Sequence, residues 1–217
     1  MRLIAESFAW PFRGGWRSSW AVGVPVVLFL PLLFIPLLGY AVEATRAAER
    51  DPSQGPPPWR LSDRLISDGV WVMFAIAITE VPFVFLAHLA GAFRAANVWQ
   101  SNDAVLSYVH AYVLALFILA LPSGLLALLF LPHATARFAA GGRARDLFDF
   151  AGSIRSVRRD FATWNVVAAA IVTGWAIGLA CAGLLCVGLV PGIYYAILVS
   201  AHASAALKAP DSNLAAG

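Results

Sequence analysis

The chain has 217 residues, of which 60% are hydrophobic and only 12% are charged, and its mean hydropathy is +0.76. Soluble domains carry roughly 25% charged residues, so this composition excludes an ordinary water-soluble globular protein and predicts an integral membrane protein. The formal net charge is only +3, and the arginines are interspersed with aspartates, so we expect no binding to nucleic acid.

Five apolar stretches approach the roughly 20 residues that a helix needs to cross about 30 Å of hydrocarbon. They cover residues 20–42, 69–93, 105–131, 165–187 and 189–207. Because these runs are continuously apolar and lack the alternation of transmembrane strands, they predict helices. We therefore expect an all-α, polytopic helical membrane bundle with four or five membrane helices. It would form one transmembrane domain over residues 1–207, followed by a polar C-terminal tail at 208–217.

The first stretch, residues 20–42, contains three prolines, at Pro25, Pro31 and Pro36. Prolines also occur in ordinary membrane helices, so one straight span is a reasonable interpretation. The other interpretation is a broken, re-entrant hairpin, whose backbone the remaining helices would have to cover. The sequence leaves both interpretations open, and with them the side of the membrane on which the N-terminus lies.

Arginines concentrate before the first stretch, in the first loop and in the long third connection. They are Arg2, Arg13 and Arg17, then Arg46, Arg50, Arg60 and Arg64, and then Arg137, Arg143, Arg145, Arg155, Arg158 and Arg159. The first and third loops lie on the same side because two spans separate them, and the positive-inside rule places that side in the cytoplasm. We therefore expect a multi-pass protein of the cell inner (cytoplasmic) membrane, with its C-terminus and main basic loops in the cytoplasm.

The third connection contains an amphipathic pattern over residues 143–161. Its apolar side chains recur at steps of three or four residues, at Leu147, Phe150, Ile154, Val157 and Phe161. Its basic side chains fall largely elsewhere on the helical wheel, at Arg145, Arg155, Arg158 and Arg159. The pattern predicts a cytoplasmic surface helix whose arginines contact anionic lipid head groups or a docking partner. Simple anchoring of a long loop to the lipid bilayer is the alternative.

Short motifs occur in a fixed order along most of the chain. They are Trp10-Pro11-Phe12, Gly39-Tyr40, Pro58-Trp59, Asp68-Gly69, Ala136-Arg137-Phe138-Ala139, Phe148, Ile154, Gly192-Ile193-Tyr194-Tyr195 and His202. In this order the chain resembles, over about residues 8–207, a prokaryotic integral-membrane family known as domain of unknown function 4013. The resemblance implies a membrane fold, but no activity, substrate or catalytic residue. The chain departs from the family pattern at Thr79-Glu80-Val81-Pro82, where relatives tend to carry an aromatic residue before the proline.

Glu80 is the strongest candidate for a functional side chain, because it lies near the middle of the second stretch. An ionisable group at that depth is costly and often functional, and Pro82 leaves a backbone carbonyl one turn earlier free to pair. Glu80 and this carbonyl could form a proton or cation site, and His88 lies two turns further on, roughly on the same face. The alternative is a protonated carboxyl that is hydrogen-bonded to a neighbouring helix through Thr79. His110 is a possible ligand for a pigment, haem or metal, with interfacial polar packing as the alternative.

Small residues recur every four positions in the fourth stretch, at Ala170, Gly174, Gly178 and Ala182. Such a row lets another helix approach closely. That helix belongs either to the same chain or to a membrane protein partner or second copy.

The sequence contains no metal-ligand spacing, P-loop, dinucleotide fingerprint, nucleophile elbow or paired carboxylates, so we expect neither an enzyme nor a bound cofactor or metal. A non-catalytic scaffold or accessory subunit of a larger membrane complex is the first functional hypothesis, because no catalytic site is evident and the outer loops are short. A small transporter or channel-like protein that uses the buried carboxylate of Glu80 is the alternative.

Overall fold

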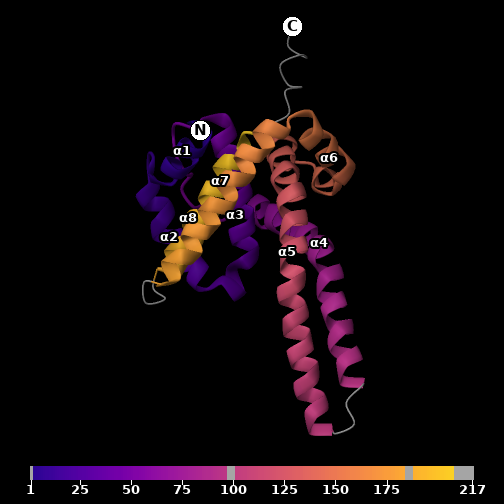
Figure 1. The fold of residues 1–217 in the computed structure, drawn as a ribbon. Coiled ribbons are helices and arrows are strands. Elements are labelled where there is room, and N and C mark those ends of the chain that lie inside the picture. The colour runs from indigo at the N-terminus through magenta and orange to yellow at the C-terminus, as the bar shows by residue number, and fades with distance from the viewer. Residues whose placement is uncertain (1, 97–100, 184–187, 208–217) are drawn as a thin grey trace. The chain divides into compact units, whose positions relative to one another are not determined.

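The structure, a computed structural model, describes residues 2–96, 101–183 and 188–207, and every regular element in these ranges is helical (Figure 1). The elements are α1 (Arg2–Ala9), η1 (Trp10–Phe12), α2 (Trp16–Leu28), α3 (Leu30–Arg50), α4 (Asp63–Ala96), α5 (Ser101–Gly141), η2 (Ala144–Phe148), α6 (Phe150–Arg159), α7 (Phe161–Ala180), η3 (Cys181–Gly183) and α8 (Leu189–Ala205). The prediction of an all-α fold is confirmed.

Four helices within the described ranges are long and apolar enough to cross a membrane. They are Leu30–Arg50, Asp63–Ala96, Ala104–Gly141 and Phe161–Ala180, and α8 is a shorter apolar helix. Both α4 and α5 extend beyond the predicted stretches 69–93 and 105–131 at each end. Residues 184–187 of the fourth predicted stretch and the predicted tail at 208–217 lie outside the described residues.

The chain forms two compact units. Unit 1 comprises Met1–Met73 and Phe130–Gly217, and unit 2 comprises Phe74–Leu129. Unit 2 thus consists of the C-terminal part of α4 and the N-terminal part of α5, whereas the other ends of these two helices belong to unit 1.

Residues 20–42 do not form one straight helix. The chain breaks at Phe29, which has φ −96° and ψ 30° and separates α2 from α3. Pro31 has no N–H with which to bond the carbonyl one turn earlier, which favours a break at this point. Ser19 and Tyr40, at nearly equal distances along the chain from Phe29, are hydrogen-bonded to each other. The chain therefore reverses, and α2 and α3 form a broken hairpin. That this hairpin re-enters the membrane stays a prediction, because α3 by itself is long and apolar enough to cross.

The amphipathic segment at residues 143–161 is not one helix but is divided among η2, α6 and the start of α7. Two aspartates explain this difference. Asp149 caps α6 by accepting a hydrogen bond from the N–H of Gly152 (2.8 Å), and Asp160 caps α7 by accepting one from the N–H of Thr163 (3.1 Å). An aspartate at these positions stabilises the first turn of a new helix in preference to a continuous one.

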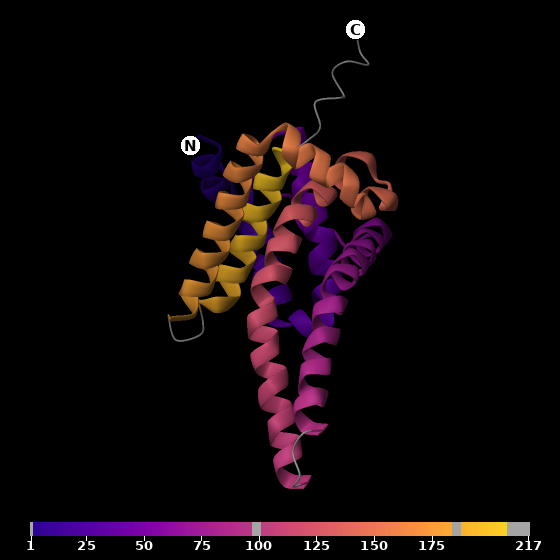
Figure 2. The same ribbon diagram turned by 45° about the vertical axis from the view of Figure 1, so that its right-hand side comes forward.

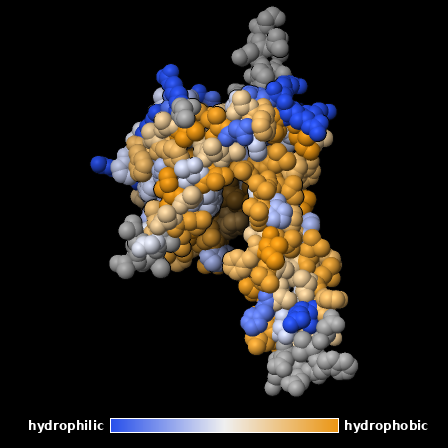
Figure 3. Space-filling view, viewed as in Figure 1, coloured by the Kyte–Doolittle hydropathy of each residue, from blue (hydrophilic) through white to orange (hydrophobic). Residues whose placement is uncertain are grey.

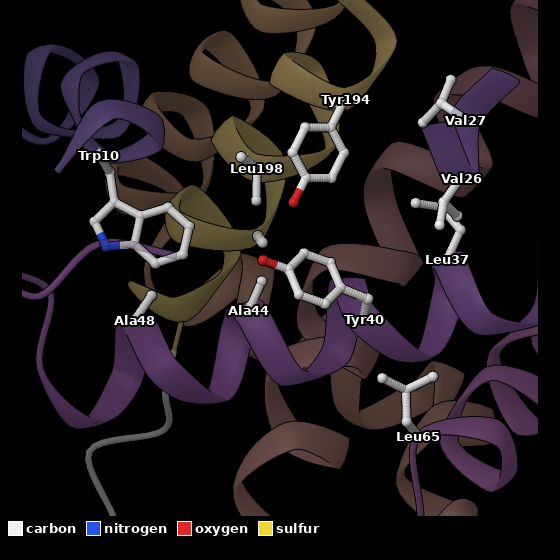
Figure 4. Packing of buried hydrophobic residues seen from close by; sticks show 11 residues of the cluster. Trp10, Val26, Val27, Leu37, Tyr40, Ala44, Ala48, Leu65, Tyr194 and Leu198 are labelled. Carbon is white, nitrogen blue, oxygen red and sulfur yellow. The ribbon is translucent and has the colours of Figure 1, made fainter. Parts of the chain in front are cut away.

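The core of unit 1 is built around α8, which packs against α7, α3 and α2 (Figures 1 and 2). The buried hydrophobic cluster draws on η1, α2, α3, the start of α4 and α8 (Figure 4). It contains Trp10, Val26, Val27, Leu37, Tyr40, Ala44, Ala48, Leu65, Tyr194, Leu198 and Ala201. Hydrophilic side chains gather at the end of this unit where α1 and α6 lie (Figure 3).

Unit 2 is an antiparallel pair of long helices. The two helices approach closely where Gly91 of α4 faces Tyr108 of α5. Their surface is mostly hydrophobic (Figure 3), and large side chains such as Phe93, Phe117 and Leu121 are exposed. Of the 18 consecutive residues that are most apolar in each helix, only 17% in α4 and 6% in α5 are buried within the chain. Such a surface is suited to contact with lipid or with another protein.

Candidate functional site

Four polar side chains from separate segments meet in the core of unit 1. We call Ser19 of α2, Tyr40 of α3, Trp59 of the following loop and Tyr194 of α8 the tyrosine cluster. The Ser19 hydroxyl lies 2.6 Å from the Tyr40 hydroxyl and 2.5 Å from the Tyr194 hydroxyl. The indole N–H of Trp59 donates to the Tyr194 hydroxyl (3.2 Å), and its ring stacks on Tyr40 with 4.0 Å between centroids. Figure 4 shows the two tyrosine hydroxyls directed toward each other.

The hydrogen bonds of the tyrosine cluster run in one consistent direction. Tyr40 donates to the carbonyl of Pro57 (2.7 Å), so it accepts from Ser19. The Ser19 hydroxyl in turn accepts from Tyr194, whose proton also reaches the backbone carbonyl of Ser19 (3.2 Å), and the Tyr194 hydroxyl accepts from Trp59. Because each hydroxyl has one proton, this chain uses every donor. The chain of hydrogen bonds ends at a peptide carbonyl and joins α2, α3 and α8.

Replacing Ser19 by alanine is expected to lower the free energy of unfolding by about 1–3 kcal/mol, because it leaves buried tyrosine hydroxyls without their partner. The neighbouring Ser18 is the matched control, since it is exposed and bonds only the carbonyl of Gly15 (2.8 Å). Thermal unfolding of the two variants in detergent measures the difference. Equal melting temperatures for Ser19→Ala and Ser18→Ala would contradict the assignment.

Ser7 and His202 form a second buried polar pair in unit 1. The Ser7 hydroxyl lies 2.9 Å from Nδ1 of His202, and the ring of Trp10 packs on the imidazole at 5.4 Å between centroids. A serine beside a histidine is part of many nucleophilic sites. Here, however, Ser7 is 0% and His202 4% exposed, so no substrate reaches the hydroxyl. The pair attaches α1 and η1 to α8.

Arg46 joins three helices of unit 1 through a buried guanidinium. It forms ion pairs with Glu43 (2.5 Å) and with Asp68 of α4 (3.1 Å) and donates to the carbonyl of Ala139 in α5 (3.1 Å). The side chain of Arg46 is 5% exposed and that of Asp68 10%. Both charges are therefore removed from water and compensate each other.

From the sequence, Arg46 was expected in the first loop, and no pattern marked this ion pair. In the structure, α3 continues to Arg50, so Arg46 is a helical residue that faces the interior. The available signal was the absence of glycine and proline between Gly39 and Pro52, which allows a helix to continue. The partner, Asp68, belongs to a motif that carried the family resemblance.

Arg137 and Asp149 form an ion pair (2.7 Å) that joins α5 to the first turn of α6. The hydrogen bond from the Arg137 guanidinium, together with that from the N–H of Gly152, holds the pKa of Asp149 below its usual value. Asp149 therefore remains charged at neutral pH, which is the state that caps α6 best.

The four arginines predicted to contact lipid are all exposed on unit 1. Arg145 lies in η2, and Arg155, Arg158 and Arg159 lie in α6. On the apolar side of the same segment, Leu147 and Val157 are buried, whereas Ile154 and Phe161 are exposed. The contact of these arginines with anionic lipid stays a prediction.

The structure places the predicted polar residues of the membrane stretches in unit 2. Glu80 is half-buried and, among the residues that the structure describes, has no hydrogen bond or ion pair. Thr79 does not provide a hydrogen bond to Glu80, because the Thr79 hydroxyl donates to carbonyls of its own helix at 2.8 and 3.2 Å. Nδ1 of His88 lies 2.8 Å from the Tyr108 hydroxyl of α5. His110 is exposed.

The row of small residues on α7 faces α8 of the same chain. Ala170, Gly174 and Gly178 are buried. A methyl group added at Gly174 would lie 2.9 Å from Val199, and one added at Gly178 would overlap the backbone of Gly192. Ala182, the last member of the row, lies in η3.

No group of three or more His, Cys, Asp or Glu side chains in the described part of the chain is arranged to hold a metal ion. Cys181 is a free cysteine in η3, and Cys186 lies outside the described residues.

The motifs that carried the family resemblance converge in unit 1. Tyr40, Trp59 and Tyr194 form most of the tyrosine cluster, and Asp68 holds Arg46. A family described as a protein of unknown function (DUF4013) matches residues 24–187, which is more than half of the chain. No curated protein and no solved structure matches. The chain therefore belongs to the DUF4013 family, and the resemblance found in the sequence is confirmed.

Proposed function

We propose that this protein is a non-catalytic subunit of a larger membrane complex and that unit 2 is its contact with the partner. The observation that carries this proposal is the side chain of Glu80. It lies near the middle of the apolar part of α4, half-buried and without a hydrogen bond or ion pair to any described residue.

An ionisable side chain at the centre of a membrane helix costs about 2.5–3.5 kcal/mol on insertion scales. Side chains at this depth are usually paired with another polar group, because hydrocarbon offers none. The Thr79 hydroxyl donates to a carbonyl of its own helix, and His88 is hydrogen-bonded to Tyr108 of α5. A helix of a second protein that carries a hydrogen-bond donor or a cation would supply the partner for Glu80.

Unit 1 supports a structural role for the protein. Its buried polar groups in the tyrosine cluster and around Arg46 are bonded to one another across helices. They hold helices together. By contrast, α4 and α5 in unit 2 present apolar side chains that the chain itself does not cover. A unit with a bonded polar core, together with a hairpin whose apolar side chains the described chain leaves exposed, suits a scaffold or accessory subunit.

Native purification with a mild detergent, followed by mass spectrometry of the bound proteins, tests the proposal. The wild-type protein is expected to carry a stoichiometric membrane partner. Glu80→Leu, which cannot accept a hydrogen bond, is expected to reduce the bound partner by about tenfold, equivalent to about 1.4 kcal/mol. Glu80→Gln, which keeps an acceptor oxygen, is expected to lose less.

Thr79→Val is the matched control, because the Thr79 hydroxyl bonds only carbonyls of its own helix. It is expected to retain the partner at the wild-type level. A wild-type protein that purifies alone, or a Glu80→Leu variant that keeps its partner, would overturn the proposal.

The carboxyl group of Glu80, which has no hydrogen bond or ion pair to a described residue, also suits a small transporter or channel-like protein that carries a proton or a cation. In that case the reconstituted wild-type protein conducts a measurable flux, and Glu80→Gln abolishes it while the protein still folds. An unchanged flux in Glu80→Gln rejects this second function.

A further inference from the structure

A cleft of about 480 Å³ opens in unit 1 beside the first turn of α4. Its lining includes Tyr40, Glu43, Pro57, Arg60, Ser62 and Arg64. The volume is within the usual range for sites that bind small molecules or head groups. No role assigned above uses the side chains of Arg60 and Arg64.

The two arginines give the cleft positive charge that its carboxylate does not cancel. Arg60 is exposed, and Arg64 is 63% exposed with its Nε 4.0 Å from Asp68, at the outer limit of an ion pair. Asp68 is bound more closely by the buried Arg46 (3.1 Å), which also neutralises Glu43. The guanidinium groups of Arg60 and Arg64 thus remain available to an anion.

The wall of the cleft opposite α4 is held in place before any ligand binds. The hydroxyl of Tyr40 donates to the carbonyl of Pro57 (2.7 Å), and the ring of Trp59 stacks on that of Tyr40. On the other side, the hydroxyl of Ser62 accepts a hydrogen bond from the N–H of Leu65 (3.2 Å) and caps α4. A fixed wall reduces the entropy that binding would otherwise cost.

We propose that this cleft binds a phosphate ester of a polyol. The phosphate lies between the guanidinium groups of Arg60 and Arg64, whose planar forks match phosphate oxygens. The carboxylate of Glu43 is 36% exposed, and it accepts a hydrogen bond from a hydroxyl group of the ligand. The cleft lies beside the first turn of α4, a helix long and apolar enough to cross a membrane, and lipid phosphates lie at the ends of such helices. A phospholipid head group and a soluble phosphate ester share this chemistry.

The test uses the full-length protein and the variant that carries both Arg60→Gln and Arg64→Gln. Arg50→Gln is the matched control, because Arg50 is an exposed arginine at the end of α3 that does not line the cleft. The first probe is a nanodisc of phosphatidylglycerol and phosphatidylcholine, from which the lipids retained by the protein are counted by native mass spectrometry. The second probe is glycerol 3-phosphate, whose effect on the melting temperature is measured in detergent.

If the phosphate ester is a lipid head group, the wild-type protein and Arg50→Gln are expected to retain phosphatidylglycerol in preference to phosphatidylcholine. The double variant is then expected to bind it about tenfold more weakly. If the ligand is a soluble phosphate ester, glycerol 3-phosphate is expected to raise the melting temperature of the wild-type protein and of Arg50→Gln, but not that of the double variant. The proposal is overturned when neither probe separates the double variant from the wild-type protein. It is equally overturned when Arg50→Gln loses as much binding as the double variant.

Discussion

Replacing Arg46 by methionine is expected to destabilise unit 1 by about 3–5 kcal/mol, because the substitution leaves the buried carboxylate of Asp68 without its main partner. Exposed ion pairs contribute little to stability, with typical values of about 0–1 kcal/mol. This pair is different, since the Arg46 side chain is 5% exposed. The same guanidinium also bonds the carbonyl of Ala139, so three helices lose a common contact.

Thermal unfolding in detergent, followed by tryptophan fluorescence, measures this effect. A loss of 3–5 kcal/mol corresponds to a fall in melting temperature of roughly 10 °C for a chain of this size. Arg64→Met is the control, because Arg64 approaches the same carboxylate only to 4.0 Å and is 63% exposed. It is expected to change stability by less than about 1 kcal/mol.

Removing both charges separates the cost of the unpaired carboxylate from that of lost packing. The double variant Arg46→Met with Asp68→Leu is expected to recover much of the stability lost in Arg46→Met, because no charge then remains buried. Equal melting temperatures for Arg46→Met and Arg64→Met would show that the pair does not hold the three helices.

The sequence predicted the helical class and the family because these depend on local properties. Continuous apolar runs identify membrane helices, and the order of motifs such as Gly39-Tyr40 identifies relatives. Glu80 was also recognised, since one charge within an apolar run needs no knowledge of the fold. Its lack of a partner within the described chain became visible only in the structure.

The features that the sequence did not reveal depend on contacts between distant segments. The tyrosine cluster unites Ser19 with Tyr194, 175 residues apart, and no local pattern marks Ser19. Helix ends were missed for a different reason. Asp149 and Asp160 interrupt a regular apolar periodicity by capping new helices. At each break, a hydrogen bond accepted by one aspartate outweighs the hydrophobic pattern.

Replacing Gly39 by alanine is expected to lower the free energy of unfolding by about 2–3 kcal/mol, because α3 and α4 cross with their backbones in contact at this residue. A methyl group at Gly39 would overlap the carbonyl of Leu65, and one at Gly69 would overlap the carbonyl of Ile35. The obstructing atoms are backbone, which cannot rotate away as a side chain can. Moreover, α3 is fixed directly after the crossing by Tyr40 and Arg46.

Gly124→Ala in α5 is the matched control, since an added methyl group there meets no atom within 4 Å. It is expected to be neutral or to stabilise the helix by up to about 1 kcal/mol, because alanine restricts the unfolded chain more than glycine does. Melting temperatures in detergent compare the two variants. The same loss in both would mean that the effect of Gly39→Ala comes from the helix itself and not from the crossing.

The double variant Gly39→Ala with Gly69→Ala distinguishes a single crossing from two independent contacts. Once one methyl group has forced α3 and α4 apart, the second enters space that is already open. Its additional cost is therefore expected to be smaller than its cost alone, as is usual for residues in direct contact. Strictly additive losses of stability would indicate that the two glycines act at separate places. The role of Gly39 and Gly69 would then not be to allow the close backbone contact between α3 and α4.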